Sequence, residues 1–173
     1  VKTAAAAVAD GAFYNTGQSC CAVERVYVHE KIYAAFVAAF VATVRGFKVG
    51  DPRDEDTYIG PLTRKAQIAV LKRQVADARK KGAQLLAGGK PLARKGNYFA
   101  PTVLCDVTHK MEVMREESFG PIIGIQSVSD DAEAVRLMND SDYGLTAGVY
   151  TPDRGRAEAL LAQVKSGSAY WNC

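Results

Sequence analysis

The chain has 173 residues, of which 48% are hydrophobic, and its 22 basic and 19 acidic residues leave a net charge of +3. This length suits one domain with a sizeable core, and charges scattered along the chain exclude the dense basic footprint of a nucleic-acid-binding protein. The longest apolar stretch, Ile32–Val44, is shorter than the ~20 residues that span a bilayer, so no membrane segment is expected.

The chain contains four cysteines, two of which, Cys20 and Cys21, are adjacent. No Cys-x-x-Cys spacing occurs, and neighbouring cysteines rarely bind one metal ion, so neither a disulfide framework nor a metal site is predicted. No secretory signal opens the chain. These features predict free thiols in a reducing, cytoplasmic compartment.

The first half of the chain alternates between helical and extended patterns. The alanine-rich residues 1–10 predict a helix that breaks at Gly11. Residues 25–29 have the β-branched and aromatic content of a buried strand. Apolar residues then recur at helical spacing over 32–44, and Gly46 is a natural C-terminal stop.

The rest of the chain continues the alternation, with further helices capped by Thr63 and Ser129. The remaining expected elements are strands at 83–87, 98–103, 122–128, 146–150 and 168–172, and a helix at 153–164. Strands separated by helices of about 10–15 residues predict an α/β fold with an open, mostly parallel twisted sheet flanked by helices. No repeat or linker interrupts this pattern, so residues 1–173 are expected to form a single domain.

Cys20 is the first candidate for chemistry. A nucleophilic cysteine must react as the thiolate, so it needs a polar, partly exposed position. A turn at Gly17 frees backbone N–H groups near the sulfur that could hold an oxyanion, and a helix starting there would add positive potential. The alternative at this point is that Cys20 and Cys21 are small buried apolar residues, which is the commonest role of a free cysteine.

A second candidate segment is Glu116-Glu117-Ser118-Phe119-Gly120-Pro121. By itself it also fits two solvated acids ahead of a Phe-Gly-Pro turn that leads into a strand. Its interpretation therefore depends on the rest of the chain.

The two segments together resemble the NAD(P)-dependent aldehyde dehydrogenase family. The string from Phe13 to Ala22 fits the active-site pattern Phe-x-x-x-Gly-Gln-x-Cys-x-Ala, and Glu117 to Pro121 fits the cofactor-contacting Glu-x-Phe-Gly-Pro. Further landmarks of the family follow in the family's order and cover nearly the whole chain: Gly60-Pro61, 80–89, 96–103, 139–147 and 167–172. The joint order of these landmarks makes the resemblance specific.

The resemblance implies a role for the residues of the cysteine segment. Cys20 is the nucleophile, and Tyr14, Ser19 and Cys21 face the aldehyde pocket. Cys21 as the nucleophile is the minor alternative, because it shifts the pattern by one residue. The implied reaction is the oxidation of a small-molecule aldehyde to a carboxylic acid through a hemithioacetal and a thioester on the cysteine.

The resemblance also implies a cofactor, NAD or NADP. Glu117 binds hydroxyls of the nicotinamide-side ribose, since a carboxylate accepts two hydrogen bonds from a diol. Phe119 packs near the nicotinamide ring, where its flat apolar face helps to position the cofactor. The family forms homo-oligomers, and the same is expected of the intact protein.

The 173 residues differ from the family's pattern in what they lack. The family's cofactor-binding domain lies ahead of the cysteine, together with the glutamate that activates water and an asparagine of the oxyanion hole, and an oligomerisation tail follows. The expectation is therefore a truncated chain, 1–173, that holds the catalytic domain alone and has negligible dehydrogenase activity.

Two other classes of function remain open. His29 or His109 could act as the base of a cofactor-independent Cys-His thiol hydrolase, although both are expected to be surface residues without a catalytic part. The chain could also be a non-enzymatic thiol domain. Neither alternative explains the Glu-x-Phe-Gly-Pro segment or the ordered landmarks.

Overall fold

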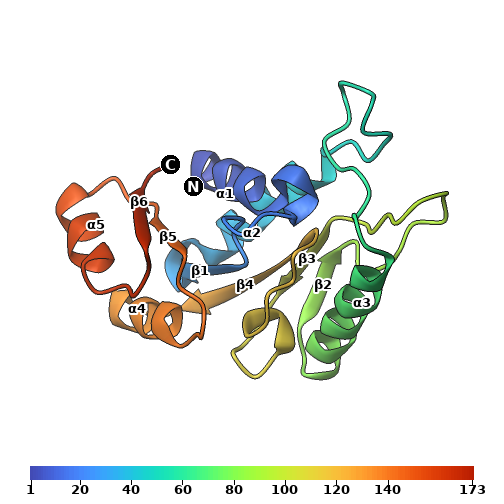
Figure 1. The fold of residues 1–173 in the computed structure, drawn as a ribbon. Coiled ribbons are helices and arrows are strands. Elements are labelled where there is room, and N and C mark those ends of the chain that lie inside the picture. Colours follow the sequence, from blue (N-terminus) through green and yellow to red (C-terminus); the bar gives the residue numbers. More distant parts are fainter.

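The computed structural model describes all 173 residues and forms a mixed α/β arrangement (Figure 1). Its helices are α1 (Lys2–Phe13), α2 (Glu30–Arg45), α3 (Lys65–Lys80), α4 (Asp131–Asn139) and α5 (Arg154–Leu161), with short 3-10 turns η1 (Tyr14–Gly17) and η2 (Glu112–Met114). Its strands are β1 (Arg25–His29), β2 (Gln84–Ala87), β3 (Thr102–Cys105), β4 (Ile122–Val128), β5 (Thr146–Val149) and β6 (Ser168–Trp171). None of the helices combines the length and hydrophobicity that crossing a bilayer needs.

The strands form two sheets. The larger has the order β1-β4-β3-β2, in which β1, β4 and β3 are parallel and β2 is antiparallel. The smaller pairs β5 with β6 in parallel. The predicted α/β fold with a mostly parallel sheet is confirmed, and its strands are divided into a four-stranded and a two-stranded part.

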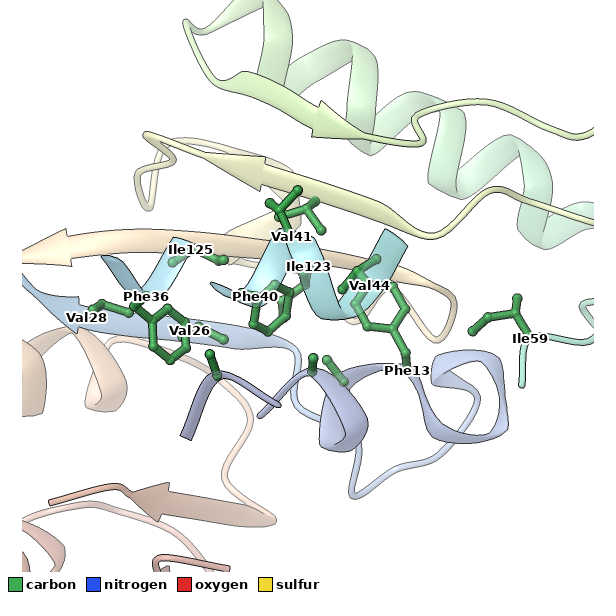
Figure 2. Close-up of a cluster of buried hydrophobic side chains, with 14 residues drawn as sticks. Phe13, Val26, Val28, Phe36, Phe40, Val41, Val44, Ile59, Ile123 and Ile125 are labelled. Carbon is green, nitrogen blue, oxygen red and sulfur yellow. The ribbon is translucent and has the colours of Figure 1, made fainter. Parts of the chain in front are cut away.

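The core of the main sheet lies on both of its faces. Alternate residues of β4 point to opposite faces, so Ile123 packs in the cluster under α1 and α2 while Ile122 packs in the cluster under α3. Figure 2 shows the first cluster, in which Phe13 of α1 lies 6.3 Å, ring centre to ring centre, from Phe40 of α2. Strand β4 is thus buried on both faces, as its continuous apolar run predicts.

Gly11 does not break the first helix, which continues to Phe13. The glycine is there for close packing: a Cβ at Gly11 would lie 3.2 Å from Cγ2 of Val23. Its carbonyl oxygen also accepts the Val23 N–H at 2.9 Å. The segment that leads from the cysteine to β1 therefore lies directly against α1.

The two predicted caps are wrong by one residue each. Helix α3 begins after Arg64, because the Thr63 N–H donates to Gln18 and holds Thr63 in the preceding loop. Helix α4 is capped by Asp130, whose carboxylate accepts the Glu133 N–H at 2.8 Å. Aspartate can cap a helix as well as serine does, so local sequence could not separate the two neighbours.

Candidate active site

The cysteine segment is presented by a strained turn. Three successive residues of η1, Asn15, Thr16 and Gly17, have positive φ angles of 49°, 62° and 70°. Non-glycine residues adopt this left-handed region at a cost, so neighbouring structure must hold them there. Thr16 is 3% exposed, and its hydroxyl oxygen accepts the Gly60 N–H at 3.0 Å.

Gln18 ties the same turn to the loop ahead of α3. Its Oε1 accepts the Thr63 N–H at 2.8 Å, and its Nε2 donates to the Pro61 carbonyl at 3.3 Å. The Gly-Gln pair of the cysteine pattern is therefore structural: Gly17 allows the turn and Gln18 anchors it.

Cys20 is exposed in an open turn between η1 and β1. The expected helix start beside it is absent, because the chain passes from this turn directly into an extended segment. The N–H groups of Cys21 and Ala22 donate to Ser19, at 3.3 Å and 3.0 Å. The Cys20 N–H donates to no group of the chain, so one free donor stands beside the sulfur.

Cys21 is also exposed, so the alternative of two buried structural thiols is wrong. Its Sγ lies 3.9 Å from that of Cys20, and this hydrogen bond raises the pKa of Cys21. Either thiol can be the donor in this contact, and the raised pKa of Cys21 favours Cys20 over Cys21 as the nucleophile.

Tyr14 and Ser19, the other two predicted pocket residues, are in contact with each other. The Tyr14 hydroxyl donates to the Ser19 hydroxyl oxygen, which also accepts the Cys21 N–H. The three predicted pocket residues thus form one short hydrogen-bonded chain around the turn that carries Cys20.

The Glu-x-Phe-Gly-Pro segment lies against this turn, although about 100 residues separate the two. A Cβ on Gly17 would lie 2.3 Å from the carbonyl oxygen of Gly120, so the two backbones are in direct contact. Glu117 and Phe119 are exposed on either side of the fully buried Ser118, and Phe119 has a positive φ of 46°. The structure therefore brings together the two segments that the sequence singles out.

A cavity of about 1540 Å³ opens beside the junction and extends between the edges of β1 and β5. Three of the six predicted site residues line it: Cys20, Cys21 and Glu117. The other three, Tyr14, Ser19 and Phe119, do not line it. An exposed thiol and an exposed carboxylate thus face the same space.

Sequence reasoning missed Glu24, which also lines this cavity. Its two carboxylate oxygens accept the N–H groups of Ser118 and Phe119, both at 3.0 Å. Burial raises the pKa of Glu24, and the two N–H donors act in the opposite direction. The signal for it in the sequence is an acidic residue inside the otherwise apolar Ala22-Val23 approach to β1.

Neither histidine is hydrogen-bonded to Cys20. His109 Nε2 lies 2.6 Å from the Tyr27 hydroxyl and its Nδ1 lies 2.7 Å from Asp140, and burial lowers the pKa of His109. Its side chain is only 11% exposed, so the prediction of a surface residue is wrong for His109. His29 Nδ1 accepts a backbone N–H at the start of α2. No group of three or more His, Cys, Asp or Glu side chains is placed to hold a metal ion.

Known proteins resemble the whole of this chain. The sequence profile of the "Aldehyde dehydrogenase family" matches residues 1–173. The NAD(P)+ succinate semialdehyde dehydrogenase Sad of Escherichia coli (strain K12) is 40% identical over 99% of the chain and 37% of that protein. The betaine aldehyde dehydrogenase of Brucella anthropi is 38% identical over 94% of the chain and 34% of that protein.

A solved structure gives the same result. The lactaldehyde dehydrogenase of Escherichia coli superposes with a TM-score of 0.95 and 36% identity, over 99% of this chain and 36% of that chain. The chain therefore spans little more than a third of the length of the relatives that it matches.

Proposed function

The chain belongs to the aldehyde dehydrogenase family, and we propose that it carries the thiol-bearing part of an enzyme that oxidises a small aldehyde to a carboxylic acid with NAD or NADP. The observation that carries the proposal is the backbone contact between Gly17 and Gly120. Through this contact, an exposed cysteine and an exposed Glu-x-Phe pair belong to one site.

Cys20 begins the reaction. Its thiolate sulfur bonds to the aldehyde carbon, and the electron pair of the carbonyl π bond moves to oxygen to give a hemithioacetal alkoxide. The N–H of Cys20, which donates to no group of the chain, is available to hold this oxygen. One oxyanion donor is typically worth about 3 kcal/mol of transition-state stabilisation. The Cys21 thiol donates toward the attacking sulfur.

The residues present fit a nicotinamide cofactor. Glu117 offers an exposed carboxylate on the cavity wall for a ribose diol, and Phe119, 37% exposed, offers a flat apolar face. A bound NAD or NADP would supply the acceptor for the hydride and its electron pair from the hemithioacetal carbon, and loss of that hydride would leave a thioester on Cys20. The name of the Escherichia coli relative Sad includes NAD(P)+, which supports this cofactor.

Hydrolysis then frees the cysteine. The oxygen of a water molecule adds to the thioester carbon, the C–S bond breaks, and Cys20 leaves as the thiolate while the acid departs. The resemblance assigns activation of this water to a glutamate outside the 173 residues, and a general base contributes about 10²–10⁴ in rate. We therefore expect negligible turnover from the isolated chain, and sustained aldehyde-dependent NADH formation by it would contradict this expectation.

We also propose that the intact protein works in the cytoplasm and forms a homo-oligomer. A nucleophilic thiol such as Cys20 requires reducing surroundings. Large exposed hydrophobic side chains on and beside the small sheet, Tyr143, Leu145 and Tyr170, support association. Sedimentation of the intact protein at micromolar concentration tests the homo-oligomer. A monomer would contradict the proposal.

Alkylation of the chain by iodoacetamide, followed cysteine by cysteine by mass spectrometry, tests the nucleophile. Cys173 is equally classed as exposed and is the matched control, while Cys105 is buried. We expect Cys20 to react at least about tenfold faster than Cys173. The reason is that a hydrogen bond from the Cys21 thiol to the Cys20 thiolate, as a bond to a charged group, is worth about 1.5–3 kcal/mol. Excess propionaldehyde should slow Cys20 alone, and Cys21→Ala, which removes the neighbouring donor, should reduce its advantage. A Cys20 that reacts no faster than Cys173 would overturn the assignment.

A further inference from the structure

The carboxylate of Glu24 binds the backbone of the Glu-x-Phe-Gly-Pro segment, Glu117 to Pro121, which is called the cofactor segment below. It stands four residues after Cys20, at the entrance to β1, and each of its oxygens accepts one backbone N–H of the successive pair Ser118 and Phe119. Successive N–H groups in a turn that contains a left-handed residue form a concave anion site. In this chain the anion is supplied by the segment that carries the nucleophile.

The geometry of the turn requires such a partner. Phe119 is held at a φ of 46°, which a residue with a bulky side chain adopts only when its surroundings impose it. Helix α3 contributes the second contact, because Gln67 Nε2 donates to the carbonyl oxygen of Ser118. With Ser118 fully buried between these contacts, the side chains of Glu117 and Phe119 point outward.

We propose that Glu24 is a positioning residue for the cofactor: by accepting both amide hydrogens, it fixes Glu117 and Phe119 relative to Cys20, at the separation that hydride transfer requires. This inference rests on the proposed function. Glu24 touches neither the cofactor nor the aldehyde in this role, and it acts through the backbone of the Ser118-Phe119 turn. The chain thereby couples its nucleophile segment to its cofactor segment through one side chain.

The test compares Glu24→Gln and Glu24→Ala with the wild-type 173-residue chain. Glutamine keeps the size of the side chain and one carbonyl acceptor but loses the charge and the second acceptor, and alanine loses both. Glu30→Gln is the matched control, because Glu30 is an exposed acid at the other end of β1. Amide hydrogen exchange measured by nuclear magnetic resonance reports on the turn, with Ile123 of β4 as the internal reference for global unfolding.

We expect exchange at Ser118 and Phe119 to rise about tenfold over Ile123 in Glu24→Gln, more in Glu24→Ala, and not at all in Glu30→Gln. The second readout is titration with nicotinamide mononucleotide, the half of the cofactor that Glu117 and Phe119 would hold. We expect its affinity to fall at least about fivefold in Glu24→Gln, with that of Glu30→Gln unchanged.

The outcomes separate this inference from the proposed function. Unchanged exchange at Ser118 and Phe119 in Glu24→Gln overturns the positioning role. Faster exchange with unchanged affinity for nicotinamide mononucleotide also overturns it, because Glu24 would then be merely structural. If the mononucleotide shifts no resonance of Glu117 or Phe119 in the wild-type chain, the proposed cofactor site itself fails, and the positioning role fails with it.

Discussion

The junction around Cys20 and the small sheet β5–β6 differ in how much buried apolar packing holds them. The junction lies on the main sheet and is held by buried residues such as Phe13, by the Gly17–Gly120 backbone contact and by the Glu24 carboxylate. The small sheet contributes no residue to either core cluster, and most of its side chains are partly or fully exposed. Burial and polar contacts together fix the junction, whereas neither core cluster includes the small sheet.

The small sheet and α5 are joined to the rest of the chain by a few polar contacts. Arg156 forms a two-point ion pair with Asp131 of α4, at 2.6 Å and 2.5 Å. The Asn139 side chain bonds to the backbone of Gln163 and Lys165, at 2.8 Å and 2.7 Å. Half-exposed ion pairs contribute little to stability. The candidate site therefore lies on the stable part of the chain, while the C-terminal part is held weakly.

The largest expected effect comes from removing a ring under the junction. Phe40→Ala leaves a cavity beside Phe13 and should lower the free energy of unfolding by about 3–5 kcal/mol. Tyr170→Ala in β6, where the side chain is 46% exposed, should change it by less than about 0.5 kcal/mol. Urea unfolding of both variants measures the difference, and similar losses would remove the contrast between the two regions.

The next effect concerns the backbone contact that joins the two motifs. Gly17→Ala adds a Cβ 2.3 Å from the Gly120 oxygen at a φ of 70°, so it should cost about 3 kcal/mol and slow alkylation of Cys20. The control is Gly82→Ala, which also has a positive φ, 101°, but meets nothing within 4 Å. It should cost only the ~1–2 kcal/mol of backbone strain. Equal costs in thermal unfolding would show that the contact contributes nothing.

A smaller effect is expected from the ion pair that holds α5. Arg156→Gln should raise amide exchange in β5 and β6 about two- to threefold, because a half-exposed pair is worth roughly 0.5 kcal/mol, and leave β4 unchanged. Arg154→Gln removes a pair with Glu158 inside α5 and is the matched control. If exchange in β4 rises together with that in β5 and β6, the two regions unfold as one unit.

The smallest effect is a pH dependence at the boundary between the regions, where His109 links Tyr27 of β1 to Asp140 after α4. Burial lowers the pKa of His109 below 6.5, so the unfolded chain takes up the proton first as the pH falls. The stability from neutral His109 is therefore complete above pH 6.5 and is lost as the pH falls below it. Burial raises the pKa of Glu24, so Glu24 changes the pH dependence of stability with the opposite sign.

The difference between the wild-type chain and His109→Gln isolates the histidine, because Glu24 contributes equally to both. Unfolding curves at pH 7.5, 6.5 and 5.5 should converge for the two proteins as the pH falls. A constant difference at all three values would contradict a neutral His109 in the folded state.

The local pattern of the chain predicted its elements well. Strand 25–29 and strand 122–128 begin and end where the sequence places them, and α2 ends at Gly46. The strand predicted at 98–103 overlaps β3 only at Thr102 and Val103. The other errors occurred where a local signal had two interpretations. Gly11 could break a helix or allow close packing, and Ser129 competed with Asp130 for the same cap.

The candidate site was predicted in part. Cys20, Glu117 and Phe119 were chosen from their segments, and the structure exposes all three at one junction. Glu24 was not chosen, because its partners lie 94 and 95 residues further along the chain. Nor could the sequence show that His109 is held by Tyr27, a contact across 82 residues.

The sequence by itself therefore determined most of the helices and strands and which two segments form the candidate site, since these depend on neighbours in the chain and on short ordered motifs. The tertiary structure alone decided that Gly17 meets Gly120, that Glu24 holds the Ser118-Phe119 turn, and that β5 and β6 form a separate sheet. The physical reason is that apolar periodicity specifies which face of an element is buried, whereas the partner that covers this face is selected by packing of the whole chain.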